Sequence, residues 1–296
     1  MSRHRSSREE RGGQREDVAF PAYATQMRAE AAAVRRVSRR VAAALARDAA
    51  AAGATRDADV LRRLRSETVT AIGRVVYSSN AVFVLEMEGP DPDHPDEPLR
   101  AIYKPARGER PLWDFPTQTL QMREAAAYVV SAALDDGVVP PTTLRDGPHG
   151  PGSVQLFVHG PQEGANPVPE ALEEQLRSLA ALDVLINNAD RKRAHLLLGD
   201  DGRIRGIDNA LSFLPYPRQR TVLIELGGEP LPEPVARRVR ELATDGGGRR
   251  ATLRTELTGL LDRDEVAAFE ERLDLLAAAP VYPVLDPWDG RPFEWW

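Results

Sequence analysis

The chain has 296 residues, enough for one large domain or a two-lobed one, and 42% of them are hydrophobic, so a sizeable buried core is expected. It contains no cysteine, which excludes disulfides, thiolate zinc sites, iron–sulfur clusters and cysteine nucleophiles. The net charge is -6 and both signs are scattered along the chain, so nucleic acid is not an expected partner.

The sequence lacks the signals of membrane insertion or secretion. No run approaches the roughly 18 to 20 consecutive apolar residues of a membrane-spanning helix, so we expect no transmembrane segment. Residues 1–17 are polar and charged, whereas a secretory signal has an apolar stretch. These features predict a protein of the cytoplasm.

The N-terminal part of the chain predicts a disordered tail followed by a helical extension. Residues 1–20 are polar, charged and without periodicity, which is typical of disorder. Residues 21–58 are rich in helix formers, and between Val34 and Leu45 apolar residues recur every three or four positions. Another face of this helix carries four arginines, Arg35, Arg36, Arg39 and Arg40. This basic face is either a docking surface for an acidic partner or an anionic membrane, or a solvated face of a helix packed against the domain.

Residues 59–160 predict a small α+β lobe built on antiparallel strands. The segment begins with a short helix over 58–66, and an acidic, proline-rich loop over 89–98 interrupts the strands. A second, amphipathic helix is expected over 121–134. The expected strands are 69–72, 74–77, 81–86, 99–103, 138–144 and 153–159, with a turn at Ser78, Ser79 and Asn80.

Residues 161–296 predict a mainly helical second lobe. A helix with an apolar stripe is expected over 170–186, followed by the polar segment 187–195. Two short strands, 196–198 and 204–207, form a hairpin that ends at Asp208. The remainder, to about Ala279, is mainly helical and ends in a tail rich in proline and tryptophan.

The lysines of the chain point to phosphate chemistry. Of 39 basic residues only Lys104 and Lys192 are lysines, and an ammonium is a compact point charge whereas a guanidinium is a wide fork. Lys104 ends a predicted strand and precedes a helix that carries Glu124, while Asp190 and Asp208 follow a helix and a hairpin. Phosphoryl transfer from ATP requires a cation on the phosphates, carboxylates that hold metal ions, and a base near the acceptor hydroxyl.

Each of these residues also has an ordinary structural explanation. Lys104 and Glu124 could form a surface ion pair, and the asparagines and aspartate near Asp190 are common where a helix ends in a turn. A single histidine such as His195 is more often structural than a ligand. The occurrence of all of them in order, with the only two lysines inside the two motifs, favours the functional interpretation.

Several segments together resemble known kinases. The pattern Asn188-x-Asp190-Arg191-x-x-x-His195, followed by Ile207-Asp208, resembles the catalytic and metal-binding loops of phosphatidylinositol 3- and 4-kinases and of HipA-like bacterial kinases. A closer resemblance, over about Val60 to Glu225, is to an actinobacterial group considered similar to those lipid kinases. It rests on Tyr103-Lys104-Pro105, Gly108 to Phe115, Arg123 to Tyr128, Pro140-Pro141-Thr142 and Asn187 to Lys192.

The resemblance implies roles for individual residues. Lys104 would bind the phosphates of ATP with Glu124 as its partner. Asp190 would be the catalytic aspartate, and Arg191 would be a catalytic residue beside it. Asp208 would bind the metal ion. Two further segments would enclose the nucleotide: Ser78, Ser79 and Asn80 over the phosphates, and Phe157, Val158 and His159 as the hinge that receives adenine.

The sequence departs from the pattern of these families at three places. His195 stands where the larger families have an asparagine that helps to bind Mg²⁺; since imidazole suits softer ions, we expect His195 to donate a hydrogen bond or to favour Mn²⁺. Arg193-Ala194 and Asn209-Ala210 replace expected glycines, which puts full activity in doubt because Ala210 forbids most of the backbone angles that glycine permits. Lys192 either contacts the γ-phosphate or acceptor or is a solvated charge.

Together these observations predict an α+β, two-lobed protein-kinase-like fold of the atypical type, with an antiparallel-sheet N-lobe and a mainly helical C-lobe. The expected activity is ATP- and metal-dependent phosphotransfer to a hydroxyl of a protein, a metabolite or an inositol lipid. Three alternatives stay open: a pseudokinase that binds nucleotide without turnover, an interaction protein that works through the basic helix 34–45, and transfer of AMP instead of phosphate on the same fold.

Overall fold

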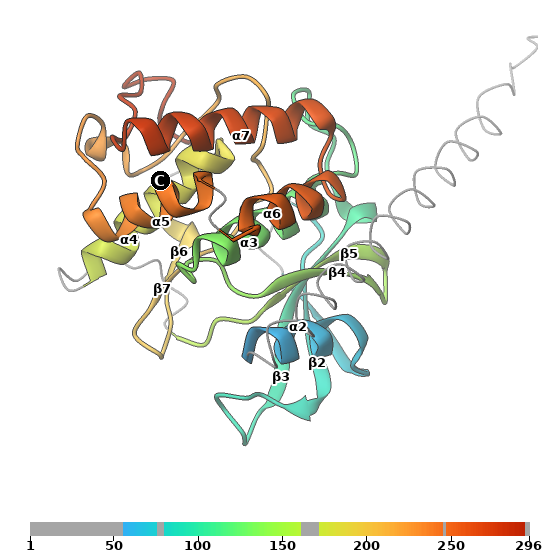
Figure 1. The fold of residues 1–296 in the computed structure, drawn as a ribbon. Helices are drawn as coiled ribbons and strands as arrows, with labels where there is room; N and C mark the ends of the chain where they lie inside the picture. The colour runs from blue at the N-terminus through green and yellow to red at the C-terminus, as the bar shows by residue number, and fades with distance from the viewer. Residues whose placement is uncertain (1–55, 76–79, 161–171, 245–246, 294–296) are drawn as a thin grey trace, which may run out of the picture.

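The computed structural model describes residues 56–75, 80–160, 172–244 and 247–293. The disordered tail predicted for residues 1–20 and nearly all of the helical extension predicted for 21–58, including its basic face, lie outside the described residues. Figure 1 shows a sheet on one side of the molecule and a group of helices on the other. No helix among the described residues is long and apolar enough to cross a membrane.

The N-terminal half is an antiparallel sheet of five strands in the order β1-β2-β3-β5-β4. Helix α2 (Arg56–Ser66) packs against it and α3 (Leu120–Leu134) connects it to the helical half (Figure 1). The strands are β1 (Val69–Arg74), β2 (Phe83–Pro90), β3 (Pro98–Pro105), β4 (Thr142–Gly147) and β5 (Gly150–Leu156).

Among its described residues, the second half contains a short hairpin and four longer helices. Helix α4 (Glu173–Ile186) precedes strands β6 (Leu196–Leu198) and β7 (Ile204–Gly206), which pair antiparallel. Helices α5 (Glu233–Ala243), α6 (Arg249–Thr258) and α7 (Arg263–Ala278) follow and lie on the side away from the sheet (Figure 1). Short 3-10 turns lie at Ala106–Gly108, Arg193–His195 and Ile224–Leu226.

Alternation along β3 decides which residues face the core and which face the helical half. Leu99, Ala101 and Tyr103 are buried and pack with residues of α2 such as Leu64. Because successive side chains of a strand point to opposite faces, Lys104 lies on the other face of the sheet. The position of the lysine therefore follows from the apolar pattern of its own strand.

A large apolar core holds the helical half together and reaches α3. The side chains of Ala125, Ala126 and Ala127 are buried in it, and these small residues let α3 pack closely on its neighbours. The buried Arg123 of α3 forms an ion pair with Glu265 of α7 and donates a hydrogen bond to the carbonyl of Ser212 at 2.6 Å. Helix α3 is thus fixed to the segment that follows Asp208.

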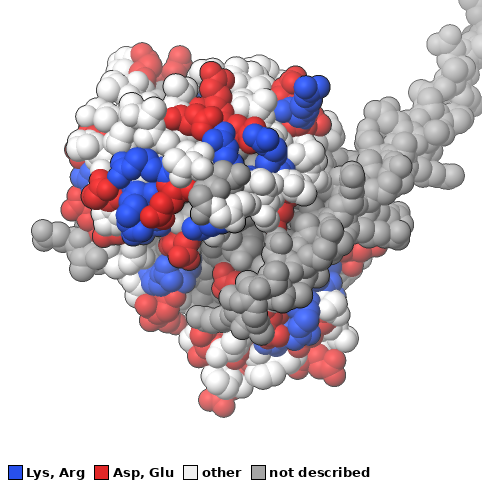
Figure 2. Space-filling view, viewed as in Figure 1, with Lys and Arg blue, Asp and Glu red and all other residues white. Residues whose placement is uncertain are grey.

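The surface carries charges of both signs. On the face seen in Figure 2, basic and acidic side chains are interspersed over the helical half. Many are paired, as in Arg250 with Asp274 at 2.7 Å on neighbouring helices. The described residues of this face therefore mix both signs of charge.

The predicted strands and helices agree with the structure apart from some boundaries, except that the mainly helical stretch expected after Asp208 contains no helix over the described residues 209–223. Strand β1 continues to Arg74, so the separate strand expected over 74–77 is wrong as far as the described residues go. Strand β4 begins at Thr142 rather than 138, because Pro140 and Pro141 cannot donate ladder hydrogen bonds. Strand β5 ends at Leu156 instead of 159, although the Phe157 N–H still donates to the Arg100 carbonyl of β3 at 3.0 Å.

Candidate active site

Lys104 lies between two carboxylates at the junction of the sheet and the helical half. Its Nζ contacts Glu124 Oε2 at 2.8 Å and also pairs with Asp208 Oδ1. The Glu124 side chain on α3 is 1% exposed, so it has exchanged water for this ion pair and for two donors of Asn209. A buried carboxylate with an ammonium partner holds that partner in a fixed position.

The loop of residues 187–192, called the Asp190 loop below, begins where α4 ends. Asn187 takes a left-handed conformation (φ 53°), which asparagine adopts more readily than most residues, and this ends the helix. The Asn188 side chain then accepts a hydrogen bond from the Asp190 N–H at 3.0 Å and donates one to Asp183 Oδ1 at 3.0 Å. Asp190 itself pairs with Lys192 Nζ at 2.8 Å.

Asp208 follows the β6–β7 hairpin and has φ 56°, a left-handed conformation that is uncommon outside glycine. Such backbone strain persists only where the surroundings enforce it, and it is concentrated at functional sites. Ala210 is not among the residues with positive φ, so this turn does not require a glycine at that position. The unusual conformation of this turn therefore lies at Asp208 and not at Ala210.

His195 lies beside Asp208. Its Nδ1 accepts a hydrogen bond from the Lys192 N–H at 3.4 Å, and its Nε2 is 3.5 Å from Asp208 Oδ2. Burial lowers the pKa of His195 to about 4, so the imidazole is neutral near pH 7. With Nδ1 as the acceptor, Nε2 carries the hydrogen and faces the carboxylate.

The ionisable side chains of the site shift one another's pKa values. The Lys104 ammonium holds the pKa of Asp208 far below its usual range. Burial by itself would lower the pKa of Lys104, but Asp208 and Glu124 outweigh it and raise this pKa. Burial raises the pKa of Asp190, which Lys192 partly offsets. A carboxylate with a raised pKa is a better base than one that is fully solvated.

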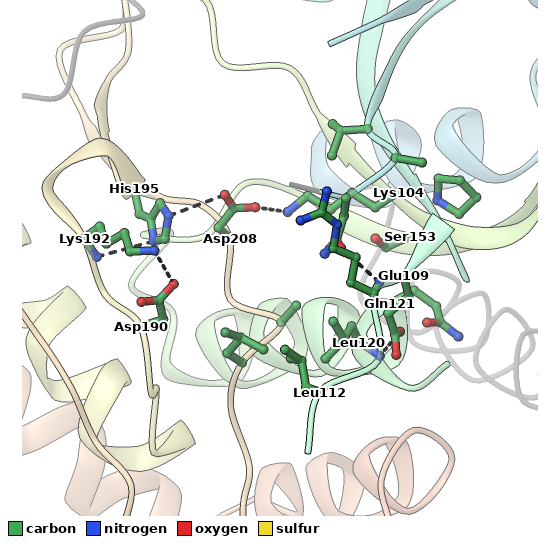
Figure 3. Close-up of a pocket in the computed structure, with 17 residues that line it drawn as sticks. Lys104, Glu109, Leu112, Leu120, Gln121, Ser153, Asp190, Lys192, His195 and Asp208 are labelled. Atoms are coloured by element: carbon green, nitrogen blue, oxygen red, sulfur yellow. Dashed lines mark hydrogen bonds and ion pairs between the residues drawn. The ribbon is translucent and has the colours of Figure 1, made fainter. Parts of the chain in front are cut away.

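A cavity of about 390 Å³ collects these side chains (Figure 3). Lys104 enters it from the sheet, whereas Asp190, Lys192, His195 and Asp208 come from the helical half. The described residues contain no group of three or more acidic or histidine side chains that could hold a metal ion by themselves. Two carboxylates fit an ion such as Mg²⁺, which takes its other ligands from water and phosphate oxygens.

Behind the cavity a buried network joins the two carboxylate segments. Arg191 binds Asp183 at 2.9 Å and 2.8 Å, and donates to the Asn209 side chain at 2.5 Å and the Ile207 carbonyl at 2.8 Å. Asn209 in turn donates its backbone N–H to Glu124 Oε1 at 2.9 Å. The chain of contacts therefore runs from Lys104 through Glu124, Asn209 and Arg191 to the Asp190 loop.

The structure places the predicted site residues in three groups. Lys104, Lys192 and the other cavity-lining residues lie together, with Glu124 directly behind Lys104. Arg191 is fully buried and does not line the cavity; its side chain bonds Asp183 and Asn209 behind it. Asn80 lines the cavity, but Ser78 and Ser79 lie outside the described residues.

The predicted adenine hinge does not line the same cavity. Phe157, Val158 and His159 line a separate one of about 340 Å³. In it the His159 ring stacks on His94 with 4.1 Å between centroids, and His159 Nε2 is 3.4 Å from Asp91 Oδ2. These residues are therefore not brought together with Lys104.

Sequence reasoning missed three residues that shape the site. Asn209 was considered only as a departure from the kinase pattern, yet it is fully buried at the centre of the network. Asp183 gave a usable signal, since it is a single aspartate within the apolar stretch of α4. Glu109 accepts hydrogen bonds from the N–H groups of Gln118 and Leu120 at 2.6 and 3.1 Å, which anchors the first turn of α3 beside the cavity.

Comparison with solved structures identifies the fold. The chain resembles hydra Fam20, solved with sugar, with a TM-score of 0.52 and 16% identity over 74% of this chain and 86% of the other. It also resembles a Golgi casein kinase with Mn/ADP bound, with a TM-score of 0.50 and 14% identity over 75% of this chain and 74% of the other. The fold is therefore kinase-like, with an antiparallel-sheet N-lobe and a mainly helical C-lobe.

Comparison with known sequences identifies the family. No family model matches the chain. Protein Rv2133c of Mycobacterium tuberculosis is 36% identical over 263 residues, which cover 77% of this chain and 91% of the relative. With this identity along most of both sequences, the chain belongs to the family of Protein Rv2133c.

Proposed function

We propose that this protein is an ATP- and metal-dependent phosphotransferase that acts on a hydroxyl group. The observation that carries the proposal is the meeting of Lys104, Asp190 and Asp208, which are far apart in sequence, around one cavity of a kinase-like fold. An ammonium and two carboxylates are the groups that phosphoryl transfer requires.

Each residue has a role in this proposal. Lys104, held by Glu124, neutralises charge on the nucleotide phosphates. Asp208 holds Mg²⁺ or Mn²⁺. His195 Nε2 donates a hydrogen bond to the Asp208 carboxylate. The bound ion supplies positive charge for the phosphate oxygens. Asp190 orients or deprotonates the acceptor hydroxyl, which its raised pKa favours, and Lys192 contacts the γ-phosphate or the acceptor.

The finer parts of the prediction belong to the same proposal. We propose that the two lobes divide near residue 160 and that Ser78 to Asn80 cover the phosphates. Because Phe157 to His159 line a different cavity from Lys104, the geometry gives no support to an adenine hinge at these residues. The Mn/ADP in the similar Golgi casein kinase supports a nucleotide and a divalent ion here. The likeness to phosphatidylinositol kinases and HipA-like kinases leaves the acceptor open among a protein side chain, a metabolite and an inositol lipid.

The geometry around Asn209 favours an active enzyme over a pseudokinase. Asn209 and Ala210 would indicate a loss of catalytic activity if they distorted the turn or interrupted the hydrogen-bond network. Instead, Asn209 joins Glu124 to Arg191, and Ala210 occupies a position without positive φ. The contact between Lys104 and Glu124 is also intact at 2.8 Å.

ATP labelled separately on the α and γ phosphates tests the proposal. Transfer or release of the γ label that requires a divalent ion, and that is lost in Asp190→Asn and Lys104→Met, is the expected result. Asp264→Asn, which changes an exposed aspartate at the start of α7, is the matched control and should keep the activity.

Two results would overturn the proposed reaction. Stable attachment of the α label to an acceptor would show nucleotidyl transfer. Tight ATP binding without turnover, under Mg²⁺ and Mn²⁺ alike, would show a nucleotide-binding scaffold instead.

A further inference from the structure

A second, larger cavity of about 870 Å³ lies in the helical half and shares no lining residue with the first. Its walls come from α4, from α7 and from the segment after Ala279, which passes along α7. Its volume is in the range of small-molecule binding sites. It is therefore large enough for a ligand of its own.

The walls of this cavity are mostly apolar. They include Val184 of α4, Leu275 and Leu276 of α7, and Val281 and Leu285 of the final segment. Leu275 is 62% exposed and Val281 43% exposed, although both are apolar. Large apolar side chains that gather around an open cavity are typical of a binding site.

One arginine in the wall, Arg272, is poorly compensated. Arg272 donates from Nε to the Leu185 carbonyl at 2.8 Å and from Nη1 to the Leu214 carbonyl at 3.4 Å, but its buried Nη2 has no hydrogen-bond partner among the described residues. Burial lowers the pKa of Arg272 to about 10, although the charge of Glu271 opposes this shift. Arg218 is better compensated, because it pairs with Asp114 at 3.8 Å and its guanidinium lies 5.6 Å from the centre of the Trp113 ring.

The acidic residues of the same wall limit the charge of a ligand. Asp286 and Asp289 line the cavity, and the backbone N–H groups of Trp288 and Asp289 hold the Asp286 carboxylate and lower its pKa. Glu271 lies beside Arg272 in the wall. These charges would repel a doubly charged phosphate monoester more strongly than a single negative charge.

We propose that this cavity binds an amphiphilic monocarboxylate, with its chain along the apolar wall and its carboxylate at the guanidinium group of Arg272. A carboxylate forms charge-assisted hydrogen bonds with guanidinium nitrogens, and it would add a bonded acidic partner that Arg272 lacks, because Glu271 acts on Arg272 through its charge alone.

The position of the cavity connects it to the candidate active site. Asn187, the first residue of the Asp190 loop, lines the cavity, and its side chain donates to the carbonyls of Leu214 and Tyr216 at 2.9 and 2.7 Å. Its Oδ1 accepts the N–H of Arg218 at 2.9 Å. An occupant would therefore lie against residues that hold the loop leading to Asp190.

Titration calorimetry of the whole chain with decanoate tests the site without reference to any activity. Decanoate, kept below its micellar concentration, should bind with one site per chain, whereas decanol and acetate should each bind at least about tenfold more weakly. Decyl phosphate should also bind more weakly than decanoate. Equal binding of decanol, tighter binding of decyl phosphate, or no binding of decanoate would each overturn the proposal.

Three variants locate the binding. Arg272→Leu should weaken decanoate binding at least about tenfold, the effect of losing a charge-assisted hydrogen bond. Leu275→Glu changes an exposed rim residue and should repel the carboxylate even if Arg272→Leu fails to fold. Arg237→Gln removes a positive charge from the exposed face of α5, outside the cavity, and should leave binding unchanged. Wild-type affinity in both folded cavity variants, or in Leu275→Glu alone if Arg272→Leu does not fold, would refute the location.

Discussion

Replacing Asn209 with alanine tests whether the buried network behind the cavity stabilises the protein. The Asn209 side chain is fully buried. Its Oδ1 accepts a hydrogen bond from Arg191 Nη2 at 2.5 Å, and its Nδ2 donates one to the Gly206 carbonyl at 3.0 Å. Alanine removes both bonds and the longer one from Nδ2 to Glu124 Oε1 at 3.5 Å, but it keeps the backbone N–H that donates to Glu124. The substitution therefore isolates the contribution of the side chain.

The expected loss follows from the partners that remain. A buried polar group left without its partner costs about 1 to 3 kcal/mol. Arg191 Nη2 keeps its bond to Asp183 at 2.8 Å, which limits the cost on that side, whereas the Gly206 carbonyl loses the side-chain donor. We expect Asn209→Ala to lower the free energy of unfolding by about 2 to 4 kcal/mol. Because folded domains have about 5 to 15 kcal/mol of stability, the variant should remain folded.

Urea denaturation followed by circular dichroism measures this difference. Asn80→Ala is the matched control, since Asn80 also accepts one hydrogen bond, from the Arg110 N–H at 3.1 Å, but does so in an exposed position. We expect the control to lose less than about 1 kcal/mol. If Asn209→Ala lost no more than Asn80→Ala, the network would not hold the site together and the reasoning would be wrong.

Three further substitutions test other parts of the structure. Burial raises the pKa of Asp136 in the folded protein to about 6. The carboxyl group therefore ionises more readily in the unfolded chain, so the folded protein loses stability as the pH rises from about 4 to 6. Asp136→Asn should therefore be about 1 to 3 kcal/mol more stable than wild type at pH 7 and equal to it below pH 4; a difference independent of pH in urea titrations would contradict this. Arg123→Met leaves Glu265 buried without its ion pair and should lower the free energy of unfolding by about 3 to 5 kcal/mol. The exposed Arg254→Met should lower it by less than about 1 kcal/mol. Similar melting curves for the two variants would refute this prediction. His195→Asn should shift the ratio of turnover with Mg²⁺ to turnover with Mn²⁺ towards Mg²⁺, and an unchanged ratio would show that His195 does not influence the ion.

Local patterns in the sequence were sufficient for most of the elements. The alternation along β3 is visible in the sequence and places Lys104 opposite the buried Tyr103. The apolar stripe of α4 and the polar residues after it likewise predict where the helix ends. These features are predictable because propensity and side-chain periodicity act within a few residues.

The candidate site was predictable in its main residues but not in its connections. The order of the motifs was enough to select Lys104, Asp190 and Asp208, because the chemistry of phosphate transfer restricts which residue types are useful. The substitution at Asn209 resembled decay when only its neighbours in sequence were known. The structural role of Asn209 depends on its hydrogen bonds with Arg191 and Glu124, which form only in the folded chain.

The sequence by itself determined the antiparallel strands and helices, the positions of the two lysines and the identity of the candidate carboxylates, since each depends on short-range pattern or on residue chemistry. Only the tertiary structure decided that Lys104 and Asp208 touch, that Phe157 to His159 line another cavity, and that Arg191 is buried. The physical reason is that packing brings together residues distant in the chain, so the environment of a charged group is fixed by neighbours that its own segment does not specify.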